Sequence, residues 1–191
     1  MSQRSLIRTT LLLIGSLACG AADSAQAREV IHDSAIALEP IPGSQTAFLT
    51  LHLDEETSPV ELSNDVELFR KGGQKAVIAR WQKQQPVVGR LLEAGKLGRD
   101  LRVAHTESLA DGGRRITLFY DREITLSEMR HMSRTREYPV TWIELEIGAD
   151  GRGQGKLVPV GRLKLVDGHL AIDRWGIQDV RLNDVRIEAA N

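Results

Sequence analysis

The chain has 191 residues, which is enough for one domain with a hydrophobic core. Hydrophobic residues make up 41% and charged residues 27%, and the formal net charge is -1, which argues against a disordered chain and against a basic surface for nucleic acid. Aromatic residues make up only 4%, too few for an extended stacking platform for bases. We therefore expect one globular domain that binds no nucleic acid.

The first 27 residues have the pattern of a secretory signal peptide. Arg4 and Arg8 precede an apolar run over residues 9–18, and small residues then lead to Ala25-Gln26-Ala27. The apolar run is shorter than the roughly 20 residues that a membrane-spanning helix needs. The sequence therefore predicts a periplasmic or secreted protein with no transmembrane helix after signal removal.

Cys19 is the only cysteine, and it lies inside this leader. Cleavage after Ala27 would leave no thiol, so we expect neither a disulfide nor a thiolate metal site. The residues from Ser16 to Cys19 also loosely resemble a bacterial lipoprotein processing site, with Ser16 where an aliphatic residue is usual. A lipid anchor at Cys19 on a membrane-attached protein therefore stays open as an alternative.

The remaining chain begins with a segment of weak periodicity. Residues 28–45 contain two prolines and a glycine and are interpreted as an N-terminal arm or an edge segment that leads into the domain. A single β-rich domain is expected over residues 46–191. Apolar and polar residues alternate at the start of this domain and predict a strand over residues 46–53.

One helical segment is expected near residues 63–85. Ser63, Asn64 and Asp65 offer N-cap side chains, apolar residues follow at helical spacing, and a proline ends the region. Gly72 and Gly73 interrupt the pattern and predict either a kink or two short helices.

Short strands dominate the rest of the chain. Two of them flank a longer loop at Asp111-Gly112-Gly113, one or two helical turns are expected over residues 126–132, and Asp167-Gly168 indicates a tight hairpin. The expected strands cover residues 101–106, 115–120, 140–147, 155–160, 162–166, 169–173 and 179–187. We therefore predict an α+β fold, mainly antiparallel β-sheet in a sandwich or a partly open barrel, with the helical segment near residues 63–85.

The run "GADGRGQGKL" over residues 148–157 resembles a phosphate-binding loop. Only three residues separate Gly151 from Gly155, Lys156 is followed by leucine rather than Ser or Thr, and a strand-like segment follows where a helix would be needed. We interpret the run as a turn between strands, in which Gly151 takes positive φ and Gly153 and Gly155 permit a bulge or a close backbone approach.

The basic segment over residues 129–142 is the candidate ligand-binding site. Its candidate residues are His131, Arg134, Arg136, Tyr138 and Trp142. Arginine binds carboxylate and phosphate groups through two parallel hydrogen bonds, and the two aromatic rings would add stacking. A solvated connection whose arginines pair with nearby carboxylates is the alternative interpretation.

No other pattern indicates a metal, a cofactor or a known catalytic motif. The five histidines are scattered without paired metal spacing, and no G-x-S-x-G motif is present. Glu144 and Glu146 alternate on one strand and are interpreted as part of a surface ladder. The tryptophans Trp81, Trp142 and Trp175 are interpreted as packing residues.

Three stretches of the C-terminal half carry a resemblance: "LGRDLRVAH", "RTREYPVTWIELEIGADGRGQGKL" and "WGIQDVRLNDVRI". Over about residues 73–187 the chain resembles a group of small secreted bacterial proteins. The resemblance implies a signal peptide and a β-rich domain. It implies no activity, cofactor or catalytic residue.

These observations lead to two functional expectations. The first is a non-enzymatic binding or envelope-associated module, whose partner is a small anion or an envelope protein. The alternative is a hydrolase or another enzyme of unfamiliar type with its site near residues 129–142. Arg134 and Arg136 would carry binding in the first case, and His131 would be required for turnover in the second.

Overall fold

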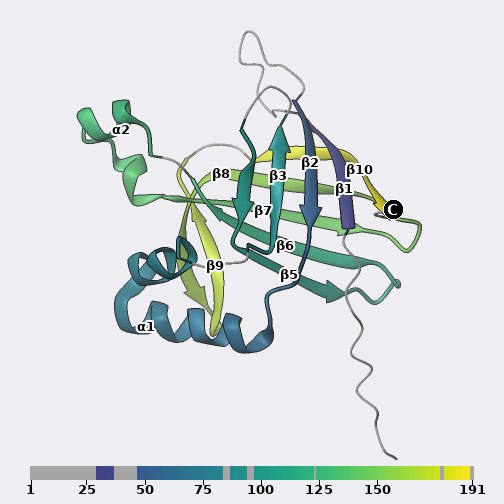
Figure 1. Cartoon of the computed structure of the whole chain (residues 1–191), viewed down its shortest axis with the longest axis horizontal. Coiled ribbons are helices and arrows are strands. Elements are labelled where there is room, and N and C mark those ends of the chain that lie inside the picture. The colour runs from purple at the N-terminus through teal and green to yellow at the C-terminus, as the bar shows by residue number, and fades with distance from the viewer. Residues whose placement is uncertain are drawn as a thin grey trace, which may run out of the picture.

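The computed structural model describes residues 29–36, 47–83, 87–93, 97–122, 124–176 and 179–189. In these residues ten strands form one antiparallel sheet in the order β4-β3-β2-β1-β10-β8-β7-β6-β5, and β9 pairs with β8 outside this path. Two helices and a 3-10 turn accompany the sheet (Figure 1). The expected α+β fold, mainly antiparallel sheet with one main helical segment, is confirmed.

The strands have the following bounds. They are β1 Glu29–Ile36, β2 Ala47–Leu53, β3 Gly89–Glu93, β4 Arg99–Leu101, β5 Val103–Ser108, β6 Arg114–Asp121, β7 Val140–Ile147, β8 Arg152–Val166, β9 His169–Arg174 and β10 Val180–Ala189. The expected strand over residues 46–53 and the hairpin of β5 and β6 are confirmed.

The sheet curls around one hydrophobic core. Every strand except β9 contributes to a single cluster of buried side chains, which includes Ile31, Leu51, Leu101, Ile116, Ile143, Leu145, Leu157 and Leu182. Figure 1 shows β1, β2 and β3 crossing in front of β5, β6 and β8. A flat sheet could not bring these strands to a common cluster, so burial of the alternating apolar residues enforces the curvature.

The chain itself joins the two ends of the strand order. Only Arg102 separates β4, at one end, from β5, at the other. The Arg102 backbone N–H donates to the Phe119 carbonyl over 2.9 Å, and Val88 N–H donates to the Leu101 carbonyl over 3.3 Å. The segment around Arg102 therefore bridges the β3 side and the β6 side of the curled sheet.

A second apolar cluster lies between the sheet and the long helix. The buried members are Val77, Trp81, Val103, Phe119, Val140 and Leu163. Trp81 and Phe119 have ring centroids 6.0 Å apart. The last part of β8 extends beyond its pairing with β10 and turns back as β9, and this hairpin packs against the helix as well.

The long helix α1 covers Pro59–Trp81 and reverses direction inside. Gly73 has φ 63° and ψ -168°, which breaks the helix as the glycine pair predicts. Asp65 contacts Arg80 and Trp81 through hydrogen bonds of 2.6–2.9 Å. A straight helix would separate residues 65 and 81 by about 24 Å. The two halves of α1 therefore fold back on each other.

The expected start of this helix at Ser63 is wrong. Ser58 is the N-cap: its hydroxyl accepts from Glu61 N–H at 3.3 Å, while the Glu61 carboxylate accepts from Ser58 N–H at 3.0 Å. This capping box and Pro59 at the first helical position start the helix earlier. Asp65 is buried and binds Arg80 and Trp81 across the reversal instead of capping the helix.

No helix in the described ranges is both long and apolar enough to cross a membrane.

The N-terminal part of the chain differs from the expected arm over residues 28–45. Residues 29–36 form β1 in the interior of the sheet, paired with β2 on one side and β10 on the other. The expected leader over residues 1–27, Cys19 and residues 37–45 lie outside the described residues. β3 and the short strand β4 have no counterpart among the expected strands.

The glycine run is a turn and not a phosphate loop. Gly151 has φ 76°, and β8 begins directly after it, so no helix N-terminus faces the run. A Cβ atom at Gly153 would lie 2.0 Å from the Glu146 carbonyl oxygen, which confirms the close backbone approach. The segments expected as two strands over residues 155–166 form the single strand β8. At the next turn, Asp167 and Gly168 have φ 50° and 83°, as a type I′ hairpin requires.

Candidate functional site

The connection between β6 and β7 leaves the sheet as a projection. We define the projection as residues 124–139; it contains α2 (Leu126–Arg130) and the 3-10 turn η1 (Arg134–Glu137). Thr125 caps α2 in a capping box with Glu128. Figure 1 shows α2 at the upper left, away from the sheet. The expected one or two helical turns over residues 126–132 are confirmed.

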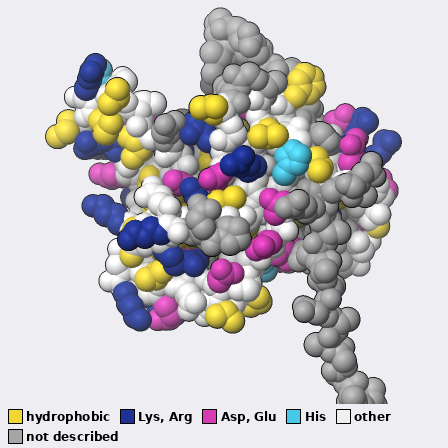
Figure 2. All heavy atoms as spheres, in the orientation of Figure 1, with side chains coloured by type: hydrophobic (Ala, Val, Ile, Leu, Met, Phe, Trp, Pro, Cys, Tyr) yellow, Lys and Arg dark blue, Asp and Glu magenta, His cyan; other side chains and the backbone are white. Residues whose placement is uncertain are grey.

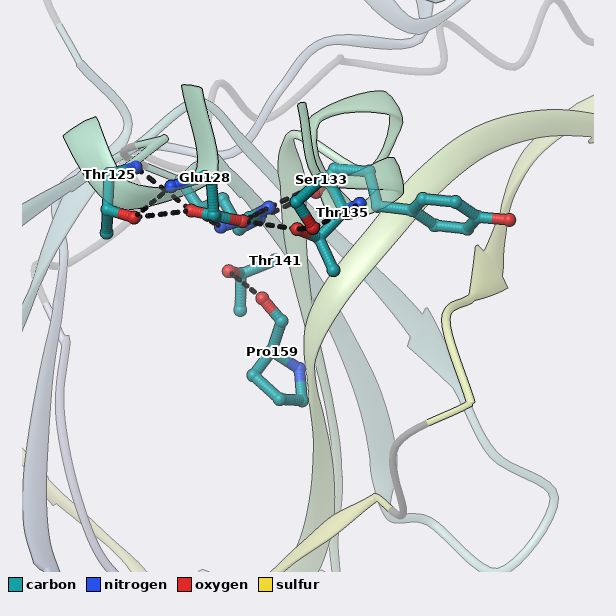
Figure 3. A network of polar contacts seen from close by, with 8 residues as sticks. Thr125, Glu128, Ser133, Thr135, Thr141 and Pro159 are labelled. Atoms are coloured by element: carbon teal, nitrogen blue, oxygen red, sulfur yellow. Dashed lines mark hydrogen bonds and ion pairs between the residues drawn. The ribbon is translucent and has the colours of Figure 1, made fainter. Parts of the chain in front are cut away.

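An ion pair at the base holds the projection together. The Arg122 guanidinium donates to both carboxylate oxygens of Glu128, at 2.7 and 3.1 Å, and to the backbone carbonyls of Thr135 and Tyr138, both at 2.7 Å. Thr135 Oγ1 donates to the same carboxylate at 2.6 Å. Figure 3 shows Glu128 between Thr125 and Thr135. One arginine therefore binds α2, through Glu128, and the segment of η1, through the carbonyls of Thr135 and Tyr138.

These contacts change the acidity of Glu128. Hydrogen bonds from Arg122, then from Thr135 and from the Thr125 backbone, hold the pKa of the Glu128 carboxyl well below its usual range. The carboxylate is therefore ionised at all physiological pH values, and its charge is compensated by Arg122 at the base of the projection.

A cleft of about 1080 Å³ lies between the second half of α1 and the base of the projection. Its lining residues are Gln74, Lys75, Ile78, Ala79, Gln82, Arg99, Asp121, Arg122, Ile124, Met129, Arg136, Glu137, Pro139 and Arg162. Five of these side chains are cationic and two are carboxylates. Figure 2 shows Lys and Arg side chains gathered on the left of the view, between the projection and α1. Cationic side chains and apolar side chains thus share one concave surface.

Gln74 joins the walls of the cleft. Its side-chain nitrogen donates to the Glu137 carbonyl at 2.8 Å, and its side-chain oxygen accepts from the Leu163 backbone N–H at 3.2 Å. The residue follows directly after the reversal at Gly73, so the turn of α1 aims it at η1 and β8. One amide side chain thereby sets the spacing of helix, projection and sheet.

Several charged groups of the cleft are already paired. Asp121 accepts from Arg102 Nε at 2.9 Å. Arg162 donates to Asp173 at 2.7 Å, and this hydrogen bond is the main cause of a raised Arg162 pKa. The Arg162 guanidinium also lies 5.1 Å from the centroid of the Tyr138 ring. These groups are held in place by the fold.

Two cationic side chains of the cleft, Lys75 and Arg136, are not paired in this way. Among the residues that the structure describes, the side chains of Lys75 and Arg136 make no hydrogen bond or ion pair. They come from opposite walls, α1 and η1. The carboxylate of Glu137 lies on the same wall as Arg136 and makes no ion pair in the described part of the chain, although it contributes to the raised pKa of Arg162. The cleft therefore contains two cationic side chains that have no protein partner among the described residues.

The structure separates the five residues expected at the site. Arg136 lines the cleft. Arg134 and His131 are exposed on the projection and do not line the cleft, and His131 Nδ1 lies 2.9 Å from the Ser127 carbonyl. The five residues therefore do not line one cleft, and the two arginines of η1 lie on different sides of the turn.

The two aromatic members of the expected site have packing roles. Tyr138 is buried, and its ring makes an edge contact with Trp175 at 5.2 Å between centroids. Trp142 is half-buried against the second cluster, with Lys156 Nζ 5.0 Å from its ring centroid. Lys156 pairs with Glu144 at 2.8 Å, and Arg115 pairs with Glu146 at 2.6 Å, as expected for a surface ladder. The Tyr138 ring supports Arg162, and the Tyr138 backbone carbonyl accepts from Arg122, so this residue helps to hold two arginines of the cleft.

Of the residues that line the cleft, only Arg136 was a candidate from the sequence; those that were missed include Gln74, Lys75 and Arg162. The glycine pair before Gln74 is the only local signal, since it predicts a reversal in front of two polar residues.

A smaller hollow of about 510 Å³ under the first half of α1 includes His105 and His169.

The described ranges contain no group of three or more His, Cys, Asp or Glu side chains positioned to hold a metal ion. Comparison of the chain with protein-family models, with curated proteins and with solved structures found no match.

Proposed function

We propose that the protein is a non-enzymatic binding module that takes a small organic anion into the cleft between α1 and the projection. One observation carries the proposal: Lys75 and Arg136 reach the cleft from opposite walls, and neither has a protein partner among the described residues. An anionic group that bridges them would complete their hydrogen bonding. The ligand class is a carboxylate or a phosphate on an organic body.

The size and lining of the cleft support an organic body. Ligand pockets commonly measure about 300–1,000 Å³ and combine apolar walls with a few polar groups. Here Ile78, Ile124 and Met129 supply apolar surface beside the cationic groups, in a volume of about 1080 Å³. A bare inorganic ion would leave most of this surface unused.

The chemistry of the lining favours binding over turnover. The described lining residues include no histidine, cysteine or serine. His131, the residue that the enzymatic alternative requires, lies outside the cleft with its Nδ1 turned to its own helix. Charge and shape are what this surface offers to a ligand.

We further infer that the protein works outside the cytoplasm. The support is the positive, apolar and A-x-A order of residues 1–27. A periplasmic or secreted location, or attachment through Cys19, would each place the cleft among exported metabolites and envelope components. A Cys19→Ser variant tests the anchor, because release from the membrane fraction is expected only if Cys19 is lipidated.

A thermal-shift measurement on the purified protein tests the binding proposal. The probes are glucose 6-phosphate and citrate at millimolar concentration, with glucose as the neutral match of the first. A ligand at about 100 times its dissociation constant adds about 2.7 kcal/mol to the unfolding free energy, which raises Tm by several degrees. We expect a rise with an anion and none with glucose.

The pair of arginines on η1 provides the matched control. Arg136→Ala should lower the affinity for the anion roughly 10- to 100-fold, because a charge-assisted hydrogen bond is lost. Arg134→Ala removes the same charge two residues away and should leave the affinity nearly unchanged. An equal loss in both variants, or no rise with any anion, would refute the proposed site.

A further inference from the structure

The outer surface of the projection exposes large apolar side chains. Leu126 is 65% exposed and Met132 is 72% exposed, while Met129, which is 46% exposed, also lines the cleft. All three lie on a segment that stands away from the sheet, where Figure 2 shows hydrophobic and cationic side chains together at the upper left. Contiguous exposed apolar surface is a common feature of sites that contact another protein or a membrane.

Cationic groups surround these apolar side chains. Arg130 and Arg134 are exposed, and neither makes an ion pair in the described residues. Within residues 124–139 the carboxylates are Glu128 and Glu137. The Glu128 carboxylate forms an ion pair with Arg122, and Glu137 lines the cleft. The outer surface of the projection is therefore apolar and positively charged.

Met132 is held in an unfavourable backbone conformation. Its φ is 51°, a left-handed value that is uncommon for residues other than glycine. Ser133 N–H donates to the Glu128 carbonyl at 3.0 Å and Met132 N–H donates to the Met129 carbonyl at 3.4 Å, which is the helix-ending pattern that usually has glycine at this position. A methionine here is strained and exposed at once, so local stability does not account for it.

We propose that the tip of the projection, defined as Leu126, Arg130, Met132 and Arg134, docks on an anionic lipid bilayer surface. The convex shape and the charge carry the choice of occupant. An interfacial bilayer region accepts protruding apolar side chains without a preformed groove, and anionic headgroups complement the arginines. The base of the projection, fixed by Arg122 and Glu128, keeps the tip turned outward.

The docking is weak and reversible. Two large apolar side chains and two arginines supply less than the two strong signals that stable membrane attachment requires. None of the four tip residues lines the cleft, so docking and anion binding are separate properties. Each can therefore fail without the other.

A fluorescent label at position 132 tests the docking directly. The label is an environment-sensitive dye attached through Met132→Cys in a Cys19→Ser background of the full chain. Vesicles of phosphatidylglycerol mixed with phosphatidylcholine should shift its emission to the blue, and vesicles of phosphatidylcholine alone should not. The same dye attached through Val166→Cys, on the hairpin of β8 and β9, should respond to neither kind of vesicle. If the chain instead bound vesicles through its N-terminal segment, the two labels would not differ in this way.

Charge and apolar variants complete the test in the labelled background. Arg130→Gln with Arg134→Gln should lower partitioning about 30-fold, the equivalent of about 1 kcal/mol for each arginine. Arg152→Gln with Lys164→Gln, two exposed cations elsewhere, should change it little. Leu126→Ser should also lower partitioning, and Val60→Ser is its match. An unresponsive label at position 132, or equal responses at positions 132 and 166, would overturn the proposal; the former result would point to a protein groove as the occupant.

Discussion

Asp65 and Arg80 form a bidentate ion pair that connects the two halves of α1 across its reversal. Asp65 Oδ1 accepts from Arg80 Nε at 2.6 Å, and Oδ2 accepts from Arg80 Nη2 at 2.8 Å. Trp81 Nε1 donates to the same Oδ2 at 2.9 Å. The buried carboxylate thereby fixes the second half of α1, which supplies one wall of the cleft.

Replacing Asp65 with alanine should destabilise the protein by about 2–4 kcal/mol, because the partly buried Arg80 guanidinium and the buried Trp81 Nε1 both lose their hydrogen-bond partner. Urea denaturation measures the change. Glu67→Ala is the matched variant: Glu67 pairs with Arg70 on the same helix, but both side chains are about half exposed. Its cost should stay below about 1 kcal/mol. Similar costs for the two variants would contradict the role of Asp65.

Replacing Gln74 with alanine should loosen the cleft. The variant loses the hydrogen bonds to the Glu137 carbonyl and the Leu163 backbone N–H. We expect faster hydrogen exchange in η1 and a weaker affinity for the anion, with little effect on the sheet. Gln154→Ala, at an exposed position of β8, is the control. Unchanged exchange in η1 would show that Gln74 does not hold the wall.

Replacing Glu137 with glutamine should increase anion affinity. Glu137 lies in the cleft beside the arginine that we assign to the ligand, and its charge repels an anion. Removing about 0.5–1 kcal/mol of repulsion raises the affinity roughly two- to fivefold. Isothermal titration with citrate measures it, and Glu67→Gln outside the cleft should have no effect. A weaker affinity in Glu137→Gln would mean that the carboxylate contacts a cationic part of the ligand.

The ion pair of Glu128 predicts a specific pH dependence. Because the folded state lowers the Glu128 pKa, its contribution to stability is complete above the unfolded pKa of about 4.3 and declines as pH falls below that value. The difference in unfolding free energy between the wild type and Glu128→Gln should be constant from about pH 6 to pH 8 and shrink below about pH 4.5. A difference that persists unchanged to about pH 3 would contradict this assignment.

Two glycines of the run over residues 148–157 should respond differently to substitution. Gly153→Ala places a Cβ atom against the Glu146 carbonyl, so the strands must separate, at a cost of about 2–3 kcal/mol. Gly151→Asn has open space and needs only positive φ, which asparagine tolerates, so it should cost about 1 kcal/mol or less. Thermal unfolding distinguishes the two, and the reverse order would contradict the turn geometry.

Local patterns determined most of the elements of this protein. Alternation of apolar and polar residues indicated β2, β6, β7 and β10, because one face of each strand is buried in the common core. Asp167-Gly168 and Gly151 announced their turns through the backbone conformations that these residues favour. Gly72-Gly73 announced the reversal of α1. Each of these signals depends on residues close together in the sequence.

The tertiary structure decided how those elements meet. β1 pairs with β2 on one side and with β10 on the other, and β10 lies near the opposite end of the sequence. No local pattern in residues 29–36 specifies these partners. The cleft arises in the same way, since Lys75 faces the projection only after α1 has folded back on Asp65. Long-range burial and pairing, rather than propensity, select these arrangements.

The candidate site shows the same division. The basic segment over residues 129–142 was evident from composition, but its five candidate residues do not line one cleft. A 3-10 turn advances about 120° per residue, so residues 134 and 136 point in different directions. Arg136 therefore lines the cleft while Arg134 stands outside it. The sequence determined that this segment carries arginines, and only the placement of η1 beside α1 decided which of them lines the cleft, because the direction of a side chain depends on how its turn is held as well as on its residues.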